Sequence, residues 1–518
     1  MPEYRAPVET GVRLAEIIAP FSMAIDLDIG QPMQHALGAC LLAVRLGEVL
    51  GFPEEELTDI YYLALVRYIG CTANQHVDAE VLGDDLAARV WVLAIDFGDQ
   101  DQFMTMLREN VGEGERLTAV LAGLSRMLTE NLPAHCEAGQ YLARQLGLSR
   151  VVQEALTQVY ERWDGKGLPR GLKGEEIARP LRVVQLAHHA QIWRRRAGDS
   201  AAIAMVRQRS GGWYDPLIAE GFCALAPQIL TSLDADIDWE MVLDREPGPR
   251  PTLAEDQLDS CLEAMADFTD LLLPQFSGHS RGVADLACAA AECYGLPRVD
   301  AFAVRRAGLV HDLGRLAVPA AIWRKPGPLT SSERERVRLH PYYTERVLAR
   351  APALAPLGAL AARHHERLDG SGYHVGLRAP LLPDRARILA TADVYHALIE
   401  SRPHRAALSP ERAASELHAE VRAGRLEAKA VDAVLLASGH RTRARRRGWP
   451  ARLSDRQVEV LRLVARGLTN RDIGERLSLS ENTVHHHVLH IYGKIGVSTR
   501  AAATLFALQH DMLDVLFS

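Results

Sequence analysis

One short stretch of the chain concentrates residue types that could do chemistry. Residues 363–373 read RHHERLDGSGY, with the adjacent imidazoles of His364 and His365 followed by the glycines at 370 and 372. Neighbouring imidazoles can hold two metal ions, and glycines let a backbone loop come close to a bound phosphate. A histidine-rich helix end followed by a turn, with no functional role, would have the same sequence pattern. The interpretation therefore depends on the rest of the chain.

Further histidines and acids lie in segments whose patterns predict helices. Residues 278–295, 301–319 and 386–402 carry apolar side chains at i, i+3 and i+4 spacing, which is typical of helices in a bundle. Polar side chains on such helices converge inside the bundle, where imidazole suits iron, manganese or zinc and a carboxylate bridges two metals. The residues of ligand type in this part of the chain are His279, His311, Asp312, His340, His364, His365 and Asp393.

The first part of the chain repeats the part that holds these residues. The offset between equivalent positions is 279 − 35 = 244 up to the His-Asp pair and 340 − 135 = 205 beyond it. One offset held over several separated landmarks indicates a duplication. The change of offset implies an insertion of 244 − 205 = 39 residues in the first copy, between Thr72 and Leu132.

The first copy has lost most of the ligand types. It keeps His35 and His135, but Arg67-Tyr68 replaces the His-Asp pair, Val159-Tyr160 replaces the paired histidines, and His188 replaces Asp393. A cation at a ligand position repels a metal, so this copy is predicted to bind none and to pack against the second copy or sense a ligand. A different polar site is a less favoured alternative, built from Cys71, His76, His188 and His189.

Two proline- or arginine-rich seams divide the 518 residues into blocks of 1–245, 255–440 and 450–518. The last 79 residues carry thirteen Arg and Lys against seven Asp and Glu, although the whole chain has a net charge of −7. A basic tail on an acidic body favours nucleic-acid contact by the tail alone. Seven scattered cysteines, no signal peptide and no long apolar run predict a cytoplasmic protein that does not enter a membrane.

The basic block has the pattern of a helix-turn-helix. Ser454 is placed to cap a first helix that ends at Gly467, and Thr469 or Asn470 to cap a second. Residues 478–480 form the turn, and a third helix from Glu481 to Lys494 would enter the major groove of DNA.

The second copy resembles a known family. The ordered set of His311-Asp312, His340-Pro341 and the 364–373 stretch is similar to the HD-GYP branch of the HD phosphohydrolases. The resemblance implies an all-α fold with two HD-domain-like helical bundles in tandem, the first degenerate. It also implies a metal-dependent phosphodiesterase that hydrolyses cyclic di-GMP with two divalent metals, iron or manganese.

Carried over onto this sequence, the resemblance assigns roles. His311, Asp312 and Arg315 would act in catalysis, with Asp312 bridging the metals that all seven residues of ligand type would hold. The substrate loop would comprise Asp369, Gly370, Gly372 and Tyr373. This sequence departs from the family at Arg315, usually Lys, at His374, usually Pro, and at Gln275, where a Glu would bind a third metal, so two metals are expected.

Residues 450–515 resemble the LuxR/GerE type of DNA-binding domain, a small four-helix unit. The resemblance implies binding of double-stranded DNA by a homodimer, with contacts from Thr469, Asn470, Glu481, Asn482, Thr483, His485, His486 and Lys494. The imidazoles at 485 and 486 replace the usual first cation and weaken the grip on phosphate. The arginine-rich linker at 440–450 is expected to compensate.

The favoured hypothesis is a cyclic di-GMP phosphodiesterase fused to a DNA-binding output. Two alternatives stay open. In one, the metal site senses a nucleotide without turning it over, and the protein is a transcription factor. In the other, the site hydrolyses a different phosphate ester.

Overall fold

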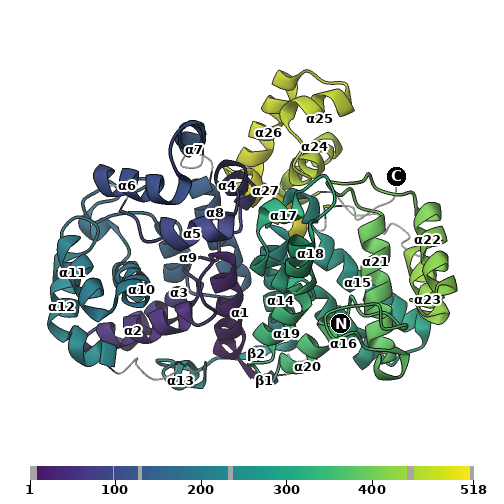
Figure 1. Cartoon of the computed structure of the whole chain (residues 1–518), viewed down its shortest axis with the longest axis horizontal. Helices are drawn as coiled ribbons and strands as arrows, with labels where there is room; N and C mark the ends of the chain where they lie inside the picture. Colours follow the sequence, from purple (N-terminus) through teal and green to yellow (C-terminus); the bar gives the residue numbers. More distant parts are fainter. Residues whose placement is uncertain are drawn as a thin grey trace. The chain divides into compact units, whose positions relative to one another are not determined.

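The computed structural model is almost entirely helical and describes residues 9–96, 99–126, 131–231, 237, 239–439, 449–510 and 512–513 (Figure 1). The chain divides into two compact units, Met1–Cys261 and Leu262–Ser518. The prediction of an all-α protein is confirmed. Within the described residues no helix is long and apolar enough to cross a membrane. Residues 440–448 of the arginine-rich linker predicted at 440–450 lie outside the described residues.

The first unit contains thirteen named helices: α1 Leu14–Asp28, α2 His35–Val49, α3 Glu54–Val66, α4 Gln75–Leu82, α5 Asp85–Val92, α6 Gln100–Val111, α7 Glu115–Arg126, α8 Leu132–Gln145, α9 Arg150–Leu156, α10 Arg179–Ala197, α11 Asp199–Gln208, α12 Pro216–Thr231 and α13 Trp239–Asp244. Strands β1 (Glu9–Arg13) and β2 (Thr252–Ala254) pair antiparallel. The proline-rich segment before β2 has neither helix nor strand, as its composition predicts. It is nevertheless packed, because buried Glu246 accepts a hydrogen bond from Tyr62 at 2.6 Å.

Helix α14 (Glu255–Asp270) contains the boundary between the two units. The second unit continues with α15 His279–Tyr294, α16 Arg298–Val310, α17 Ala320–Trp323, α18 Ser331–Arg338, α19 His340–Leu348, α20 Ala355–Ala361, α21 Asp384–Leu398, α22 Pro410–Arg422 and α23 Ala428–Gly439. Helix α15 packs against α16, α21 and α23, and α19 packs against α20. Their buried apolar side chains form the bundle core, so the polar residues at helix ends are drawn inside with them.

The duplication is visible in the helix bounds. Helix α3 shifted by 244 residues gives the bounds of α16, and α9 shifted by 205 gives those of α20. The isolated bridge Asp164–Lys173 recurs as Asp369–Arg378 at the offset of 205. Helices α4 to α7 lie in the range 72–132, where the sequence predicts the insertion. The predicted repeat is therefore confirmed by the backbone.

The C-terminal helices have the predicted helix-turn-helix order: α24 Asp455–Ala465, α25 Asn470–Leu477, α26 Glu481–Ile495 and α27 Arg500–Gln509. Ser454 and Thr469 cap α24 and α25 by accepting backbone N–H groups three residues on. The buried side chains of Ile473, Val484 and Ile491 share one apolar core. This packing fixes α26 with one apolar face inward and its polar face outward.

Candidate metal centre

The seven predicted ligands come from five parts of the second bundle. His279 and His340 are the first residues of α15 and α19, and Asp393 lies within α21. His311 and Asp312 follow the end of α16, and the paired histidines follow the end of α20. Six of these side chains are buried and His365 is partly exposed. The fold thus brings together residues separated by up to 114 positions.

Asp312 lies at the centre of the site, and its two oxygens face different partners. Oδ1 lies 3.3 Å from Nε2 of His340 and 3.5 Å from Nε2 of His364. Oδ2 lies 2.8 Å from Nε2 of His311 and 3.4 Å from Nε2 of His279. A carboxylate with a histidine pair on each side has the arrangement that bridges two metals.

Asp393 links the two sides a second time. Its Oδ1 lies 3.4 Å from Nε2 of His279, and its Oδ2 lies 3.8 Å from Nδ1 of His365. His340 and His364 approach each other at 3.1 Å between their Nε2 atoms. The predicted ligands thus supply two groups of donor atoms, one of His279, His311 and Asp312 and one of His340, His364 and His365.

Backbone carbonyls fix how the imidazoles present their nitrogens. Nδ1 of His311, His340 and His364 lies 2.7–2.8 Å from the carbonyl oxygen three residues earlier, in each case within hydrogen-bond reach. A proton on Nδ1 satisfies that carbonyl and leaves Nε2, which faces Asp312, as the nitrogen that would bind a metal. Such outer hydrogen bonds orient metal-binding histidines.

The charges of the site favour a cation. Burial opposes ionisation of Asp312 and Asp393, but neighbouring cationic and imidazole groups hold the pKa of both carboxyls well below the usual range. Burial lowers the pKa of His364 to about 4, so that its imidazole is neutral. For His311 the carboxylates of Asp312 and Asp393 outweigh burial and raise the pKa to about 9.

The donor set fits a pair of divalent metals. Nε2 of His311 and both oxygens of Asp312 are buried and make no hydrogen bond within the described structure, although charged groups lie within 4 Å. Buried polar atoms without partners are costly, and metal coordination satisfies them. Imidazoles combined with carboxylates suit iron, manganese or zinc.

Sequence reasoning missed a buried group on the far side of His279. Nδ1 of His279 lies 3.0 Å from Oε2 of Glu400, and Oε1 of Glu400 lies 3.0 Å from Nδ1 of His396. The guanidinium of Arg402 lies 2.6 Å from Glu400 and 3.4 Å from the same nitrogen of His279. His279, His396 and Glu400 form a further group of donor atoms, and the guanidinium of Arg402 beside them supplies a positive charge that opposes an additional metal ion there. The i, i+4 spacing of His396 and Glu400, one turn beyond Asp393, was the available signal.

Arg315 reaches the centre of the site, as its predicted role requires. Its Nη2 lies 2.5 Å from Oδ2 of Asp312 and 3.5 Å from Nε2 of His279. The rings of Phe276 and Trp323 flank the guanidinium. Its Nε and Nη1 are buried without a hydrogen-bond acceptor among the described residues, so this cation has donors left for an anion.

The glycine loop is pinned beside the paired histidines. Glu366 lies within the 363–373 stretch but has no role predicted from the sequence. Its carboxylate accepts hydrogen bonds from the backbone N–H groups of residues 375–377 at 2.7–3.0 Å. A Cβ on Gly372 would lie 2.5 Å from backbone atoms of residues 365–367, so only glycine fits. Gly370 has φ +81°, and Asp369 accepts the N–H of Ser371 at 2.9 Å.

Tyr373 closes the loop against the site. Its ring packs on the ring of His365, with the two centroids 4.6 Å apart. The guanidinium carbon of Arg338 lies 5.3 Å from the centroid of the Tyr373 ring. Of the four predicted loop residues, Gly372 and Tyr373 therefore lie directly against His365.

The predicted DNA contacts divide into two sets. Glu481, Asn482, Thr483, His485 and His486 are exposed on α26. Other predicted contacts are engaged within the domain: Lys494 Nζ donates to Gln457 at 2.7 Å and to the carbonyl of Arg452 at 3.0 Å, and the side chain of Asn470 accepts from Arg500. Thr469 serves as the cap of α25.

Two protein families match parts of this chain. The HD domain family matches residues 125–218 and 263–429, which together make 261 of the 518 residues. The chain belongs to the HD-domain family. The family of bacterial regulatory proteins of the LuxR type matches residues 451–507. This HD-domain protein therefore carries a LuxR-type helix-turn-helix at its C-terminal end.

Its relatives differ in how much of the chain they share. It is 29% identical to the 3'3'-cGAMP-specific phosphodiesterase 3 of Vibrio cholerae over 77% of this chain and 89% of the relative. It is 39% identical to the cyclic di-GMP phosphodiesterase response regulator RpfG of Xanthomonas campestris over 28% of this chain and 39% of that relative.

A solved structure resembles the same region. The crystal structure of a cyclic GMP-AMP-specific phosphodiesterase from V. cholerae covers 83% of this chain with a TM-score of 0.58 and 26% identity, and 98% of that structure is matched. The likeness extends over both HD copies, because it covers more of the chain than either unit contains.

Proposed function

We propose that the second copy hydrolyses a phosphodiester bond of a cyclic dinucleotide and that the LuxR-type domain makes the protein a transcriptional regulator. The observation that carries the proposal is the position of Asp312, whose two oxygens face two separate histidine groups. The relatives' activities on cyclic dinucleotides support it.

The ligand residues fit two divalent metals, iron or manganese, which would supply a hydroxide nucleophile and neutralise charge on the phosphate. Asp312 and Asp393 provide negative charge shared by both sides of the site. The carbonyl-bound imidazoles hold their Nε2 atoms in place. Arg315 binds a non-bridging phosphate oxygen through the donors that lack an acceptor within the described residues.

The substrate loop orients the nucleotide. Glu366 fixes its backbone, and Gly372 lets it approach the paired histidines closely. Tyr373 offers an aromatic face beside His365, which is suited to stacking a base or packing on a ribose.

The sequence motifs favour cyclic di-GMP, whereas the comparisons favour 3'3'-cGAMP. The relative that spans both copies is specific for 3'3'-cGAMP, and RpfG, a cyclic di-GMP enzyme, matches only 28% of this chain. We therefore propose 3'3'-cGAMP as the preferred substrate and cyclic di-GMP as the competitor to test beside it.

The DNA-binding proposal rests on the exposed face of α26. Residues 481–483 and the imidazoles of His485 and His486 face solvent at its N-terminal half, while Val484 and Val488 face the core. A helix held in this way enters the major groove of double-stranded DNA. Proteins of this architecture read paired half-sites, so a homodimer is proposed.

A sensor that does not turn over its ligand is the second candidate. The ion pair between Arg315 and Asp312 favours it, because the guanidinium occupies an oxygen that metal bridging requires. In that case nucleotide binding would alter DNA affinity without hydrolysis.

The deciding experiment uses full-length protein purified without oxygen and supplied with Fe(II) or Mn(II). Turnover of 3'3'-cGAMP and cyclic di-GMP is compared between wild type and the His311→Ala/Asp312→Ala variant, with exposed His418→Ala as control. Hydrolysis lost only in the double variant is expected. Bound metal without turnover of either nucleotide would instead support the sensor.

A further inference from the structure

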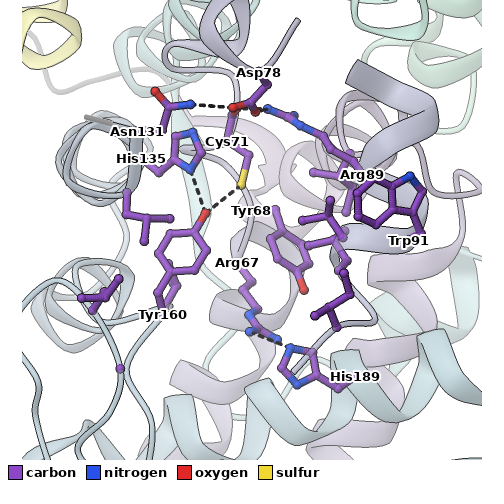
Figure 2. A pocket seen from close by; sticks show the side chains of 18 of the residues that line it. Arg67, Tyr68, Cys71, Asp78, Arg89, Trp91, Asn131, His135, Tyr160 and His189 are labelled. Atoms are coloured by element: carbon purple, nitrogen blue, oxygen red, sulfur yellow. Dashed lines mark hydrogen bonds and ion pairs between the residues drawn. The ribbon is translucent and has the colours of Figure 1, made fainter. Parts of the chain in front are cut away.

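The first copy contains a cavity at the place where the second copy holds its metal ligands. The cavity has a volume of about 210 Å³ and lies within the first unit (Figure 2). Its lining includes Arg67, Tyr68, His135 and Tyr160. The repeat offsets align these four with His311, Asp312, His340 and His365. Loss of the ligand set has therefore left a pocket and not a filled core.

The walls of the pocket are mainly apolar and aromatic. Helix α5 and the segment after it contribute Trp91, Val92, Leu93 and Ile95, and α6 contributes Phe103 and Leu107. Both helices belong to the insertion that the second copy lacks. The inserted helices thus add apolar and aromatic walls to the pocket of the first copy, the kind of surface that binds an organic ligand.

Arg67 places a positive charge in this chamber. The residue is only 4% exposed, its guanidinium lies 4.9 Å from the centroid of the Tyr68 ring, and it takes part in none of the ion pairs found among the described residues. Nη1 donates to the carbonyl of Gln185 at 3.3 Å, Nη2 lies 3.4 Å from Nε2 of His189, and Nε has no partner. Burial and Arg67 together hold the pKa of His189 well below its usual range, so this imidazole is neutral. A buried guanidinium with neutral acceptors alone calls for an anion.

The other buried cations of the pocket are already neutralised. Arg89 pairs with Asp28 at 3.1 Å and Asp78 at 3.0 Å, and Arg162 pairs with Asp96 at 2.6 Å and with Asp164. Arg67 differs from both, and three further residues of the lining hold polar atoms that are also unsatisfied. These are the hydroxyl of Tyr68, Nε2 of His135 and Oδ1 of Asn131, all buried without a hydrogen-bond partner within the described structure.

We infer that the first copy binds a small organic carboxylate, with its apolar body against the inserted helices and its carboxylate on Arg67. One guanidinium balances one negative charge and matches a carboxylate in its planar fork. The hydroxyl of Tyr68 is a second donor to the same group.

The cavity selects against the alternatives. At about 210 Å³ the cavity is smaller than the roughly 300–1,000 Å³ of pockets for drug-sized ligands, which favours a small acid over a cyclic dinucleotide. A metal ion is opposed by the charge of Arg67. The inference concerns the first copy alone and does not depend on turnover in the second.

Binding is tested on the full chain with octanoate and phenylacetate as probes and their neutral amides as matched ligands. Quenching of tryptophan fluorescence reports directly, because Trp91 and Trp213 line the pocket. Each acid is expected to bind at least about tenfold tighter than its amide, the effect of a desolvated charge pair. Arg67→Met should remove this preference and leave amide binding unchanged. The exposed control Arg45→Met should retain it.

The inference is overturned if neither acid binds at millimolar concentration, if acid and amide bind equally to wild type, or if the Met variant keeps the preference. Displacement of a bound acid by 3'3'-cGAMP would overturn it as well. Should the Met variant fail to fold by circular dichroism, the comparison of acid with amide on wild type decides. Tyr68→Phe then serves as the second variant, with a smaller loss expected for the acids.

Discussion

Glu400 should set the metal affinity of the site although it is not among the predicted ligands. Its Oε2 lies 3.0 Å from Nδ1 of His279, whose Nε2 faces Asp312 and Asp393. Glu400→Gln keeps the size of the side chain and an oxygen that can accept from Nδ1, but it removes the charge. The variant therefore tests electrostatic positioning and not the presence of a hydrogen bond.

The expected effect follows from the contacts. Two unit charges 3.0 Å apart in a medium of effective dielectric constant about 20 interact by roughly 332/(20 × 3.0), about 5.5 kcal/mol, which is an upper limit here because a metal-binding imidazole is not a full cation. The guanidinium of Arg402, 2.6 Å from the same oxygen, offsets most of that interaction. The remaining 1–3 kcal/mol matches the roughly 10–100-fold loss usual for outer partners of metal-binding histidines.

The assay is the Mn(II) concentration that half-activates phosphodiester hydrolysis, together with bound metal after dialysis. The variant should require about 10–100-fold more metal, and Glu400→Asp should recover part of the loss. Glu335→Gln, an exposed change on α18, is the matched control. Wild-type metal dependence in Glu400→Gln, with the thermal midpoint unchanged, would refute the reasoning.

Three further perturbations test other parts of the structure. Gly372→Ala should lower activity strongly and cost about 1–3 kcal/mol of stability, because the new Cβ would lie 2.5 Å from backbone atoms. The exposed control Ser371→Ala should change neither, and hydrolysis assays with thermal melting measure both quantities. Burial lowers the pKa of His135 from 6.5 to about 4, so wild type loses up to about 3 kcal/mol of stability as pH falls from about 6.5 to 4, and His135→Leu lacks that loss. Denaturant unfolding at each pH checks this, and equal pH dependence in both proteins would contradict it. Ile491→Ala should destabilise the DNA-binding domain by about 2–4 kcal/mol and weaken DNA binding, unlike the exposed Leu489→Ala; equal affinity in a gel-shift assay would contradict this.

The sequence contains the evidence for the repeat because motifs with fixed spacing survive without any knowledge of packing. The two offsets predict the bounds of α16 and α20 from α3 and α9. The caps of α24 and α25 are likewise local, since a side chain of Ser454 or Thr469 bonds an N–H only three residues away. Hydrogen bonds over three residues can be predicted from the identities of neighbouring residues alone.

The roles of Glu366 and Glu400 could not be predicted in this way. Glu366 acts on backbone nine to eleven residues on, and Glu400 acts on a histidine 121 residues away. Contacts between residues so far apart in the sequence form only when the helices pack. Lys494 was predicted to contact DNA, but its ammonium donates a hydrogen bond to Gln457 within the domain, which the sequence pattern does not reveal.

The sequence by itself determined the helical class, the duplication, the set of metal-ligand residue types and the helix-turn-helix order. Each depends on periodicity, spacing or a local cap. Tertiary structure alone decided that Asp312 lies between two histidine groups, that Arg402 supplies the cation behind His279, and that the first copy encloses a cavity around Arg67. Those facts depend on which side chains converge after burial, and burial is a property of the packed chain as a whole.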